Sequence, residues 1–296
     1  SMVDALQHSI DNNLPAPWAM PWNSATAGLP RSAQTGKVYQ GFNLIFLHHI
    51  AMAKGYSSMY WLTYKQAKKV GGSVKKGEKS SRIYWWSFIK IEEEENGKKI
   101  KKQIPFLKSF SVFNACQCDL PDNYLEKLQE DQEPTKYDNP KENWGDADKA
   151  LKDYLERENI RLSHDQQRAF YNVTNDSINM PKRKSFRSDN EYIAVLAHES
   201  AHSTMTENRC NRAADQKKGL FSNDKTDYSR EELVAEFTSG LYCGIFGVDT
   251  DELAENRTFY LRSWIKALKN DPKMIMWAGS RAHKALDYML GIETTK

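Results

Sequence analysis

The sequence contains no uninterrupted apolar run of the roughly 20 residues that a membrane-spanning helix needs. Its first residues also lack the apolar core that signal peptides carry. The first absence argues against an integral membrane protein, and the second argues against export. We therefore expect no membrane partner and a cytoplasmic location.

Cysteine is scarce as well, with four residues in 296, at positions 116, 118, 210 and 243. In a cytoplasmic protein these side chains are expected to stay reduced and not to form disulfides. Cys116 and Cys118 are separated by one residue, which is too close for an ordinary zinc knuckle. We interpret both as buried thiols.

The composition is that of a globular protein, with 40% hydrophobic and 27% charged residues. The formal net charge of +3 conceals an asymmetry along the chain. Residues 1–130 hold 17 basic and 11 acidic side chains, whereas the remaining residues hold 25 and 28. Residues 54–90 alone hold nine basic side chains and one acidic side chain. This distribution indicates two modules with different partners.

A polar segment at residues 126–144 contains Pro134 and Pro140 and is typical of a linker. It divides the chain into a first domain at residues 1–125 and a second domain at residues 145–296. We expect an α+β fold class for the whole chain, with a mainly helical second domain that also contains a small sheet.

In the first domain, residues 41–54 predict an apolar helix, and Thr63 with Gln66 predicts a capping box for a short helix. Asn96-Gly97 predicts a hairpin turn between strands at 82–91 and 99–107. The glutamates at 92–95 are then expected to face lysines across the two strands. A further strand is predicted at residues 106–113. In the second domain we predict a strand near 169–173 and helices at 146–158, 189–205, 229–245, 250–269 and 272–290.

The segment LAHESAH at residues 196–202 places His198 and His202 four residues apart. On a helix these two imidazoles lie on the same face and can bind one Zn²⁺ ion. Glu199 lies where a general base can take a proton from a water molecule that the metal activates. The alternative is a chance match on an ordinary helix. The motif predicts a zinc site, with Glu199 as the catalytic residue.

Such a site needs a third ligand from a later helix, and residues 228–236 supply candidates. Glu232 and Glu236 are four apart on one helical face. We assign Glu232 as the third ligand and Glu236 as a carboxylate that orients a ligand histidine. Glu236 or Glu231 as the ligand is the alternative, and a helix with acidic residues on its solvent face is another.

Zinc peptidases of this type usually have an edge strand beside the active-site helix, to which an extended peptide can add. Residues 169–173 or 176–180 are the candidates, although either can equally be an ordinary core strand. The acid or oxyanion partner is not evident. Tyr228 and His283 are possible, and a structural role is the simpler interpretation of each.

The first domain interleaves aromatic and basic residues, a mixture that binds single-stranded nucleic acid. Cations follow the phosphates, and flat rings stack on unpaired bases without reading sequence. The alternative is that the rings form the core while the lysines are solvated. The candidate DNA-binding residues are Trp18, Trp22, Tyr39, Trp61, Lys65, Lys68, Lys69, Lys75, Lys76, Lys79, Arg82, Trp85 and Trp86.

Several longer stretches point to one family. They are PWAMPW (17–22), TGKVYQGFN (35–43), the run at 61–80, FSVFNACQCDLP (110–121), Asn179-Met-Pro181, LAHESAH, NRCNR (208–212), YSREELVAEF (228–237) and WIKALKND (264–271). Together they resemble the ArdC-type antirestriction proteins of conjugative plasmids, and similar N-terminal domains occur in primase-related proteins of the TraC type. The family commonly has a leucine-glycine pair between the histidines, where this chain has Ser200 and Ala201. Both residues are small, so the metal site is expected to remain.

The resemblance implies an N-terminal domain that binds single-stranded DNA and a C-terminal zincin-like metallopeptidase domain. It implies protection of incoming plasmid DNA from restriction enzymes, in the cytoplasm of a bacterial host or recipient cell. Three hypotheses follow: a protein that shields DNA by binding it, a zinc endopeptidase that cleaves a host protein such as a restriction subunit, and a replication accessory. No polymerase-type group of carboxylates is evident, so the third ranks last.

Overall fold

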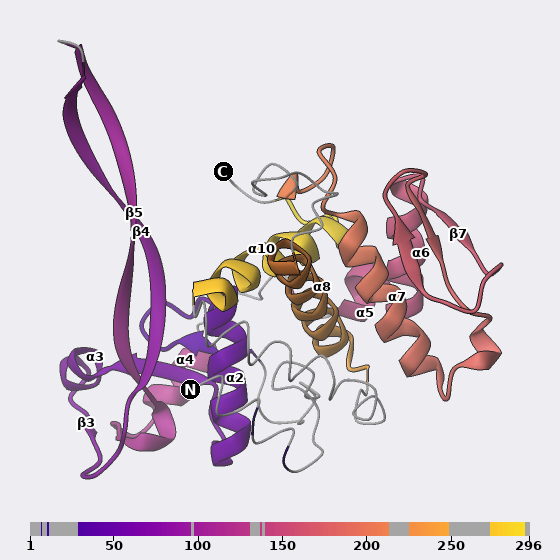
Figure 1. Cartoon of the computed structure of the whole chain (residues 1–296). Coiled ribbons are helices and arrows are strands. Elements are labelled where there is room, and N and C mark those ends of the chain that lie inside the picture. Colours follow the sequence, from indigo (N-terminus) through magenta and orange to yellow (C-terminus); the bar gives the residue numbers. More distant parts are fainter. Residues whose placement is uncertain are drawn as a thin grey trace. The chain divides into compact units, whose positions relative to one another are not determined.

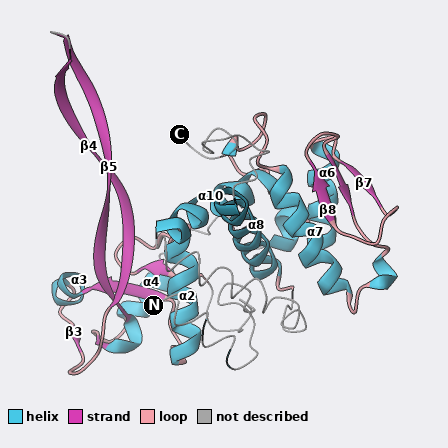
Figure 2. Ribbon diagram, in the orientation of Figure 1, coloured by secondary structure: helices cyan, strands magenta, loops and turns pink. Residues whose placement is uncertain are grey.

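The computed structural model describes residues 29–95, 98–130, 140–212, 225–248 and 273–293, together with residues 7, 11 and 137. The predicted α+β class is confirmed, and helices make up more of the described chain than strands do (Figure 2). The chain forms two compact units. The hairpin unit comprises residues 30–39 and 54–133, and the helical unit comprises residues 40–53 with the described residues after 134. None of the described helices is long and apolar enough to cross a membrane.

The hairpin unit is built around a four-stranded sheet of order β1-β2-β5-β4, beside which β3 and β6 form a two-stranded sheet. Its elements are β1 (Arg31–Ser32), β2 (Tyr60–Thr63), α3 (Tyr64–Lys69), β3 (Ser73–Val74), β4 (Ser81–Glu95), β5 (Lys98–Asn114), η1 (Ala115–Gln117), β6 (Cys118–Asp119) and α4 (Tyr124–Glu130). Its core contains Tyr60, Leu62 and Ala67, against which Phe113 and Tyr124 pack.

Strand β4 pairs with β5 along its whole length, from Ser81 opposite Val112 to Glu95 opposite Lys98, and the two strands form a ribbon (Figure 1). The strands predicted separately at 99–107 and 106–113 are one continuous strand, β5. Glu92 lies opposite Lys101, Glu94 opposite Lys99 and Glu95 opposite Lys98, as expected, whereas Glu93 lies opposite Ile100. The predicted turn residues 96–97 lie outside the described residues.

Helix α3 begins at the predicted capping box. The Gln66 amide N–H donates to Thr63 Oγ1 at 3.2 Å, and the Thr63 amide N–H donates to Gln66 Oε1 at 2.7 Å. These two bonds satisfy backbone donors that the first turn leaves without helical partners. The cap fixes the junction at which β2 passes directly into α3.

The helical unit contains three helices that pack on one another, α7, α8 and α10, and a small sheet of order β7-β9-β8. Its elements are α2 (Phe42–Lys54), α5 (Pro140–Trp144), α6 (Ala147–Arg157), β7 (Arg161–Ser163), β8 (Phe170–Asn172), β9 (Ser177–Asn179), η2 (Arg183–Ser185), α7 (Asp189–Ser203), α8 (Lys225–Phe246) and α10 (Lys273–Met289). The helix predicted at 250–269 lies outside the described residues. The segment 126–144, predicted as a linker, includes most of α4 and all of α5.

Helix α2 packs on α10 within the helical unit, although its residues belong to the predicted first domain. The approach is so close that a Cβ atom at Gly279 would lie 2.6 Å from the Phe42 nitrogen. Gly41, at φ +58°, faces the same point, because its Cβ would lie 3.2 Å from the Gly279 carbonyl oxygen. Glycine at both positions lets the backbones meet.

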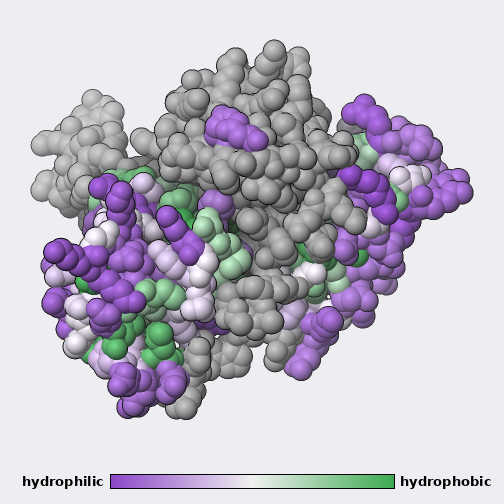
Figure 3. All heavy atoms as spheres, turned by 90° about the horizontal axis from the view of Figure 1, so that it is seen from below, coloured by the Kyte–Doolittle hydropathy of each residue, from purple (hydrophilic) through white to green (hydrophobic). Residues whose placement is uncertain are grey.

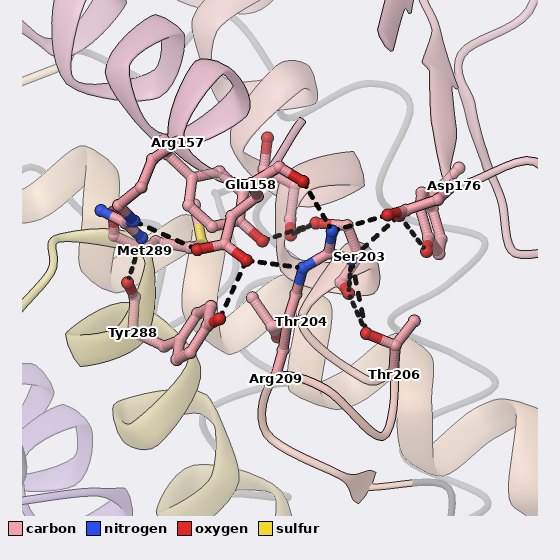
Figure 4. Close-up of polar contacts among 12 residues, drawn as sticks. Arg157, Glu158, Asp176, Ser203, Thr204, Thr206, Arg209, Tyr288 and Met289 are labelled. Carbon is pink, nitrogen blue, oxygen red and sulfur yellow. Dashed lines mark hydrogen bonds and ion pairs between the residues drawn. The ribbon is translucent and has the colours of Figure 1, made fainter. Parts of the chain in front are cut away.

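A buried arginine joins several elements of the helical unit (Figure 4). Arg209 donates to Glu158 Oε2 at 3.0 Å and to both carboxylate oxygens of Asp176 at 2.9 and 2.7 Å. It also donates to the Ser203 carbonyl oxygen at 2.9 Å, and the Tyr288 hydroxyl donates to Glu158 Oε2 at 2.9 Å. The arginine therefore ties together the ends of α6 and α7, the turn before β9, and α10.

Candidate metal centre

Helix α7 carries the histidine motif. It begins at Ser188, whose hydroxyl accepts a hydrogen bond from the Glu191 amide at 3.2 Å. No proline or glycine interrupts the helix, and Leu196, Ala197 and Ala201 are fully buried. Because these apolar residues fix the buried face, the motif histidines are held at defined positions beside α8.

The structure brings His198, His202 and Glu232 together. The two Nε2 atoms of the histidines lie 3.1 Å apart. Glu232 Oε2 lies 3.6 Å from His198 Nε2, and Glu232 Oε1 lies 3.5 Å from His202 Nε2. Each side chain is between 14% and 18% exposed, so a small ion can reach the donors from solvent.

This donor set fits a divalent ion such as zinc. A tetrahedron with metal–ligand bonds of about 2.0–2.2 Å has ligand–ligand edges of about 3.3–3.6 Å. The separations of 3.1, 3.5 and 3.6 Å, the last two measured to different oxygens of Glu232, lie close to that range. One atom from each of the three side chains can be chosen so that all three lie within 4.8 Å of one another. Two imidazole nitrogens and one carboxylate are also a ligand type that catalytic zinc sites use.

The other nitrogen of each imidazole faces a further carboxylate on α8. His198 Nδ1 lies 3.7 Å from Glu236 Oε1, and His202 Nδ1 lies 3.6 Å from Glu231 Oε1. A carboxylate on Nδ1–H turns the Nε2 lone pair toward the metal position. The placement agrees with Glu236 as an orienting residue, and it gives Glu231 a corresponding place beside His202.

The carboxylates make the site favourable for positive charge. Burial by itself lowers the pKa of His198, but the hydrogen bond to Glu232 and the charges of Glu236 and Glu199 outweigh it and raise that pKa to about 9. The same field that holds a proton on an imidazole also attracts a divalent cation. Metal and proton therefore compete for His198.

Arg212 holds Glu231 in place, a role that the sequence analysis missed. Its side chain is 2% exposed, and its Nε donates to Glu231 Oε2 at 3.0 Å. Its other nitrogens donate to Thr204 Oγ1 at 2.6 Å and to the Ala201 carbonyl at 3.0 Å. Burial raises the pKa of Glu231, but Arg212 and His202 outweigh it and keep that pKa below its usual value. Arg212 therefore joins the end of α7 to the ionised Glu231 on α8.

Glu199 follows His198 on α7 and is 8% exposed. Within the described ranges its carboxylate accepts no hydrogen bond. A carboxylate in this position is available to a water molecule at the site.

The comparisons with known proteins cover nearly the whole chain. The model for the N-terminal domain of the antirestriction factor ArdC matches residues 1–113, and the model for a zincin-like metallopeptidase matches residues 149–281. The metal-free crystal structure of antirestriction protein ArdC from plasmid R388 is 33% identical, covers 99% of this chain and 98% of its own, and has a TM-score of 0.67. This chain belongs to the ArdC family.

The family resemblance predicted from the motifs is thereby confirmed. The Mn(II)-bound structure of R388 ArdC is 34% identical over 98% of this chain and 96% of its own, with a TM-score of 0.67. A DNA primase TraC of Escherichia coli is 32% identical over 295 residues. The match covers 94% of this chain and 19% of that primase, so the chain spans about a fifth of its length.

In the zincin-like region of this ArdC-family chain, the strand order shows which of the two candidate segments is an edge strand. In the sheet β7-β9-β8, β9 is central and β8 lies at an edge and packs against α7. Residues 169–173 therefore contain the edge strand, whereas residues 176–180 contain the central one.

His283 lies in a buried group with Tyr137 and Asp287, since the Tyr137 hydroxyl lies 3.0 Å from His283 Nε2. The side chain of Tyr228 lies outside what the structure describes.

The candidate DNA-binding residues of the hairpin unit fall into distinct groups. All seven predicted cations are exposed, and in Figure 3 the left part of the face, over α3 and β3, is mainly hydrophilic. Trp85 is 68% exposed. Tyr39 is half-buried, and burial raises its pKa to about 12. The exposed cations are Lys65, Lys68, Lys69, Lys75, Lys76, Lys79 and Arg82.

One predicted stacking residue is corrected by the structure. Trp61 is 0% exposed in β2, which lies between β1 and β5 in the sheet, so its ring is part of the core. Trp18 and Trp22 lie outside the described residues. Trp86 lies in β4, but its side chain is outside what the structure describes.

Proposed function

We propose that this chain is an antirestriction protein that binds single-stranded DNA and protects incoming conjugative plasmid DNA from the recipient's restriction enzymes. The observation that carries the proposal is the likeness to ArdC of plasmid R388 along nearly the whole of both chains. The exposed lysines of the hairpin unit support it, because cations along a groove or face follow the phosphates of a single strand. This protection would take place in the bacterial cytoplasm, where the entering strand meets restriction enzymes.

For the metal centre we propose one Zn²⁺ ion held by His198, His202 and Glu232. Their Nε2 and carboxylate atoms lie at ligand–ligand distances suited to zinc. The Mn(II) ion in the related ArdC structure supports a divalent cation of this size, and metal analysis of the purified protein distinguishes the two. Glu236 and Glu231 would orient the imidazoles through Nδ1.

The bound ion would supply Lewis acidity, which polarises a carbonyl and lowers the pKa of water. Glu199 would accept the proton of the attacking water on a carboxylate oxygen and return it to the departing amide nitrogen. The edge strand β8 would pair with an extended peptide. These residues support a second candidate function, cleavage of a host protein such as a restriction subunit, with the N-terminal domain at residues 1–125 directing the enzyme to DNA.

Glu199→Ala separates the two functions. A plasmid is transferred into recipients with and without an active restriction system, and the ratio of transconjugants measures protection. We expect full protection from the variant if DNA binding shields the strand. Loss of protection with folding and DNA binding intact would instead assign it to the peptidase. Glu207→Ala, an exposed glutamate just beyond α7, is the matched control.

DNA binding is tested first with the purified chain. Fluorescence anisotropy of a labelled single-stranded oligonucleotide is measured at several salt concentrations, with the matched duplex in parallel. We expect preferential binding to the single strand, weakening as salt rises because bound cations release counterions. Equal binding to duplex, or no binding, would contradict the proposal.

A further inference from the structure

Large apolar side chains are exposed at three positions among the described residues, and all three belong to the hairpin unit. Tyr64 is 54% exposed, Trp85 is 68% exposed and Phe110 is 47% exposed. Trp85 lies on β4 and Phe110 on β5, so two of the three come from the ribbon. Exposed rings gathered on one element mark a binding surface more often than single scattered ones do.

The strand register places both rings on one face of the ribbon. Phe110 lies opposite Ile83, and Lys108 lies opposite Trp85. Residues directly opposite share a face, and alternate residues along each strand return to it. Phe106 therefore joins the same face. We call these five residues, Ile83, Trp85, Phe106, Lys108 and Phe110, the Trp85 face.

The register puts Arg82 and Tyr84 on the opposite face of the ribbon. Beyond the three residues of β5 that pair with β2, residues 112–114, the described ribbon continues as two strands only. The Trp85 face lies in that two-stranded part. Its rings are thus available to a partner.

A cation lies among the rings of this face. Lys108 is exposed, and its Nζ lies 5.2 Å from the centroid of the Phe106 ring. The segment that contains Trp85 is also strongly basic, because residues 54–90 hold nine basic side chains and one acidic side chain. Flat rings beside cations suit unpaired bases joined by phosphates, whereas the bases of a duplex are already stacked inside it.

We propose that the Trp85 face is the surface on which single-stranded DNA stacks its bases, with Trp85 and Phe110 as the stacking rings and Lys108 beside a phosphate. The inference rests on the proposed single-strand binding and deepens it by naming the surface. It adds Phe110 and Lys108 to the residues expected from the sequence. It also assigns DNA binding to one face of the ribbon only, since Tyr84 lies on the other face and is not part of the Trp85 face.

The test measures the Kd of the full chain for a labelled oligothymidine by anisotropy. Trp85→Ala and Phe110→Ala are each expected to weaken binding about tenfold, the effect of losing one stacked base. Trp85→Phe keeps a flat ring and is expected to bind within about threefold of the unmodified chain. Lys108→Gln should lower the slope of log Kd against log salt by about 0.7, the value for one phosphate contact on a single strand.

Tyr84→Ala is the matched control, since it removes a ring from the opposite face. It is expected to leave Kd unchanged, and circular dichroism confirms that each variant is folded. If the unmodified chain binds single strands but Trp85→Ala and Phe110→Ala bind equally well, the face is wrongly assigned and the proposed function stands. If the unmodified chain does not bind, both fail. Self-association that Trp85→Ala abolishes, with DNA binding unchanged, would assign the face to a second copy of the chain.

Discussion

At the scale of single residues, Arg212 and Glu231 form a buried charged pair behind the metal centre. Removing one partner of such a pair leaves a buried charge without compensation. We expect Arg212→Ala, without added metal, to lower the free energy of unfolding by about 3–5 kcal/mol. Urea denaturation measures the change.

A second arginine provides the control. Arg183 pairs with Asp148 and Asp189, but its side chain is 38% exposed. We therefore expect Arg183→Ala to lower the free energy of unfolding by less than about 1 kcal/mol. Adding Glu231→Gln to Arg212→Ala should recover part of the lost stability, because it removes the uncompensated charge. Equal losses from Arg212→Ala and Arg183→Ala would show that the buried pair does not stabilise the fold.

Asp176 gives a prediction about pH. Its hydrogen bonds to Arg209 lower its pKa against the opposing effect of burial, and the Tyr171 hydroxyl lowers it further. A carboxyl whose folded pKa is depressed adds stability above its unfolded pKa, near 4, and loses it as pH falls through the folded value. The stability difference between the unmodified chain and Asp176→Asn should therefore shrink below about pH 4. Urea midpoints between pH 3 and pH 7 measure it, and a difference that grows on acidification would contradict the assignment.

At the scale of elements, the contact between α2 and α10 depends on the absence of a side chain. Gly279→Ala would put a Cβ 2.6 Å from a backbone nitrogen of Phe42, which has no flexible end that can move aside. We expect the free energy of unfolding to fall by about 1–3 kcal/mol, the typical effect of overpacking, and thermal or urea denaturation measures it. Ser280→Ala, at an exposed position of the same helix, should change stability by less than about 0.5 kcal/mol.

The elements also show which parts of the fold a sequence can predict. The starts of α3 and α7 depend on Thr63 with Gln66 and on Ser188, which act within one turn, so local pattern was sufficient. The role of Glu232 could be predicted because it lies four residues from Glu236 on the same helix. The role of Arg212 could not be predicted, since its partner Glu231 lies 19 residues along the chain and nothing local marks the pair.

Trp61 shows a different limit. An aromatic residue beside lysines has the same local pattern whether its ring is solvated or buried. Its position in β2, between β1 and β5, decides the matter, and strand order depends on pairings distant in the sequence. The contact of α2 with Gly279 could not be predicted for the same reason, because it spans most of the chain.

At the scale of the whole molecule, the two units should respond to different ligands. Zinc is expected to slow hydrogen exchange in α7 and α8, because a ligand that binds only the folded state stabilises it by about 2.7 kcal/mol at a hundred times its Kd. Oligothymidine should instead slow exchange in β4 and β5. Exchange followed by mass spectrometry after treatment with a chelator, with and without each ligand, measures both effects. Zinc protection confined to the hairpin unit would contradict the metal assignment.

Within the described residues, every carboxylate facing the two imidazoles lies on α7 or α8. The groups that face the imidazoles, together with Arg212, therefore come from one continuous stretch of the chain, from α7 to α8. If both proposals hold, substitutions in the ribbon would change nucleic-acid binding without changing the metal ligands. The two sets of residues could then vary independently, so that one proposed activity could be lost while the other is kept.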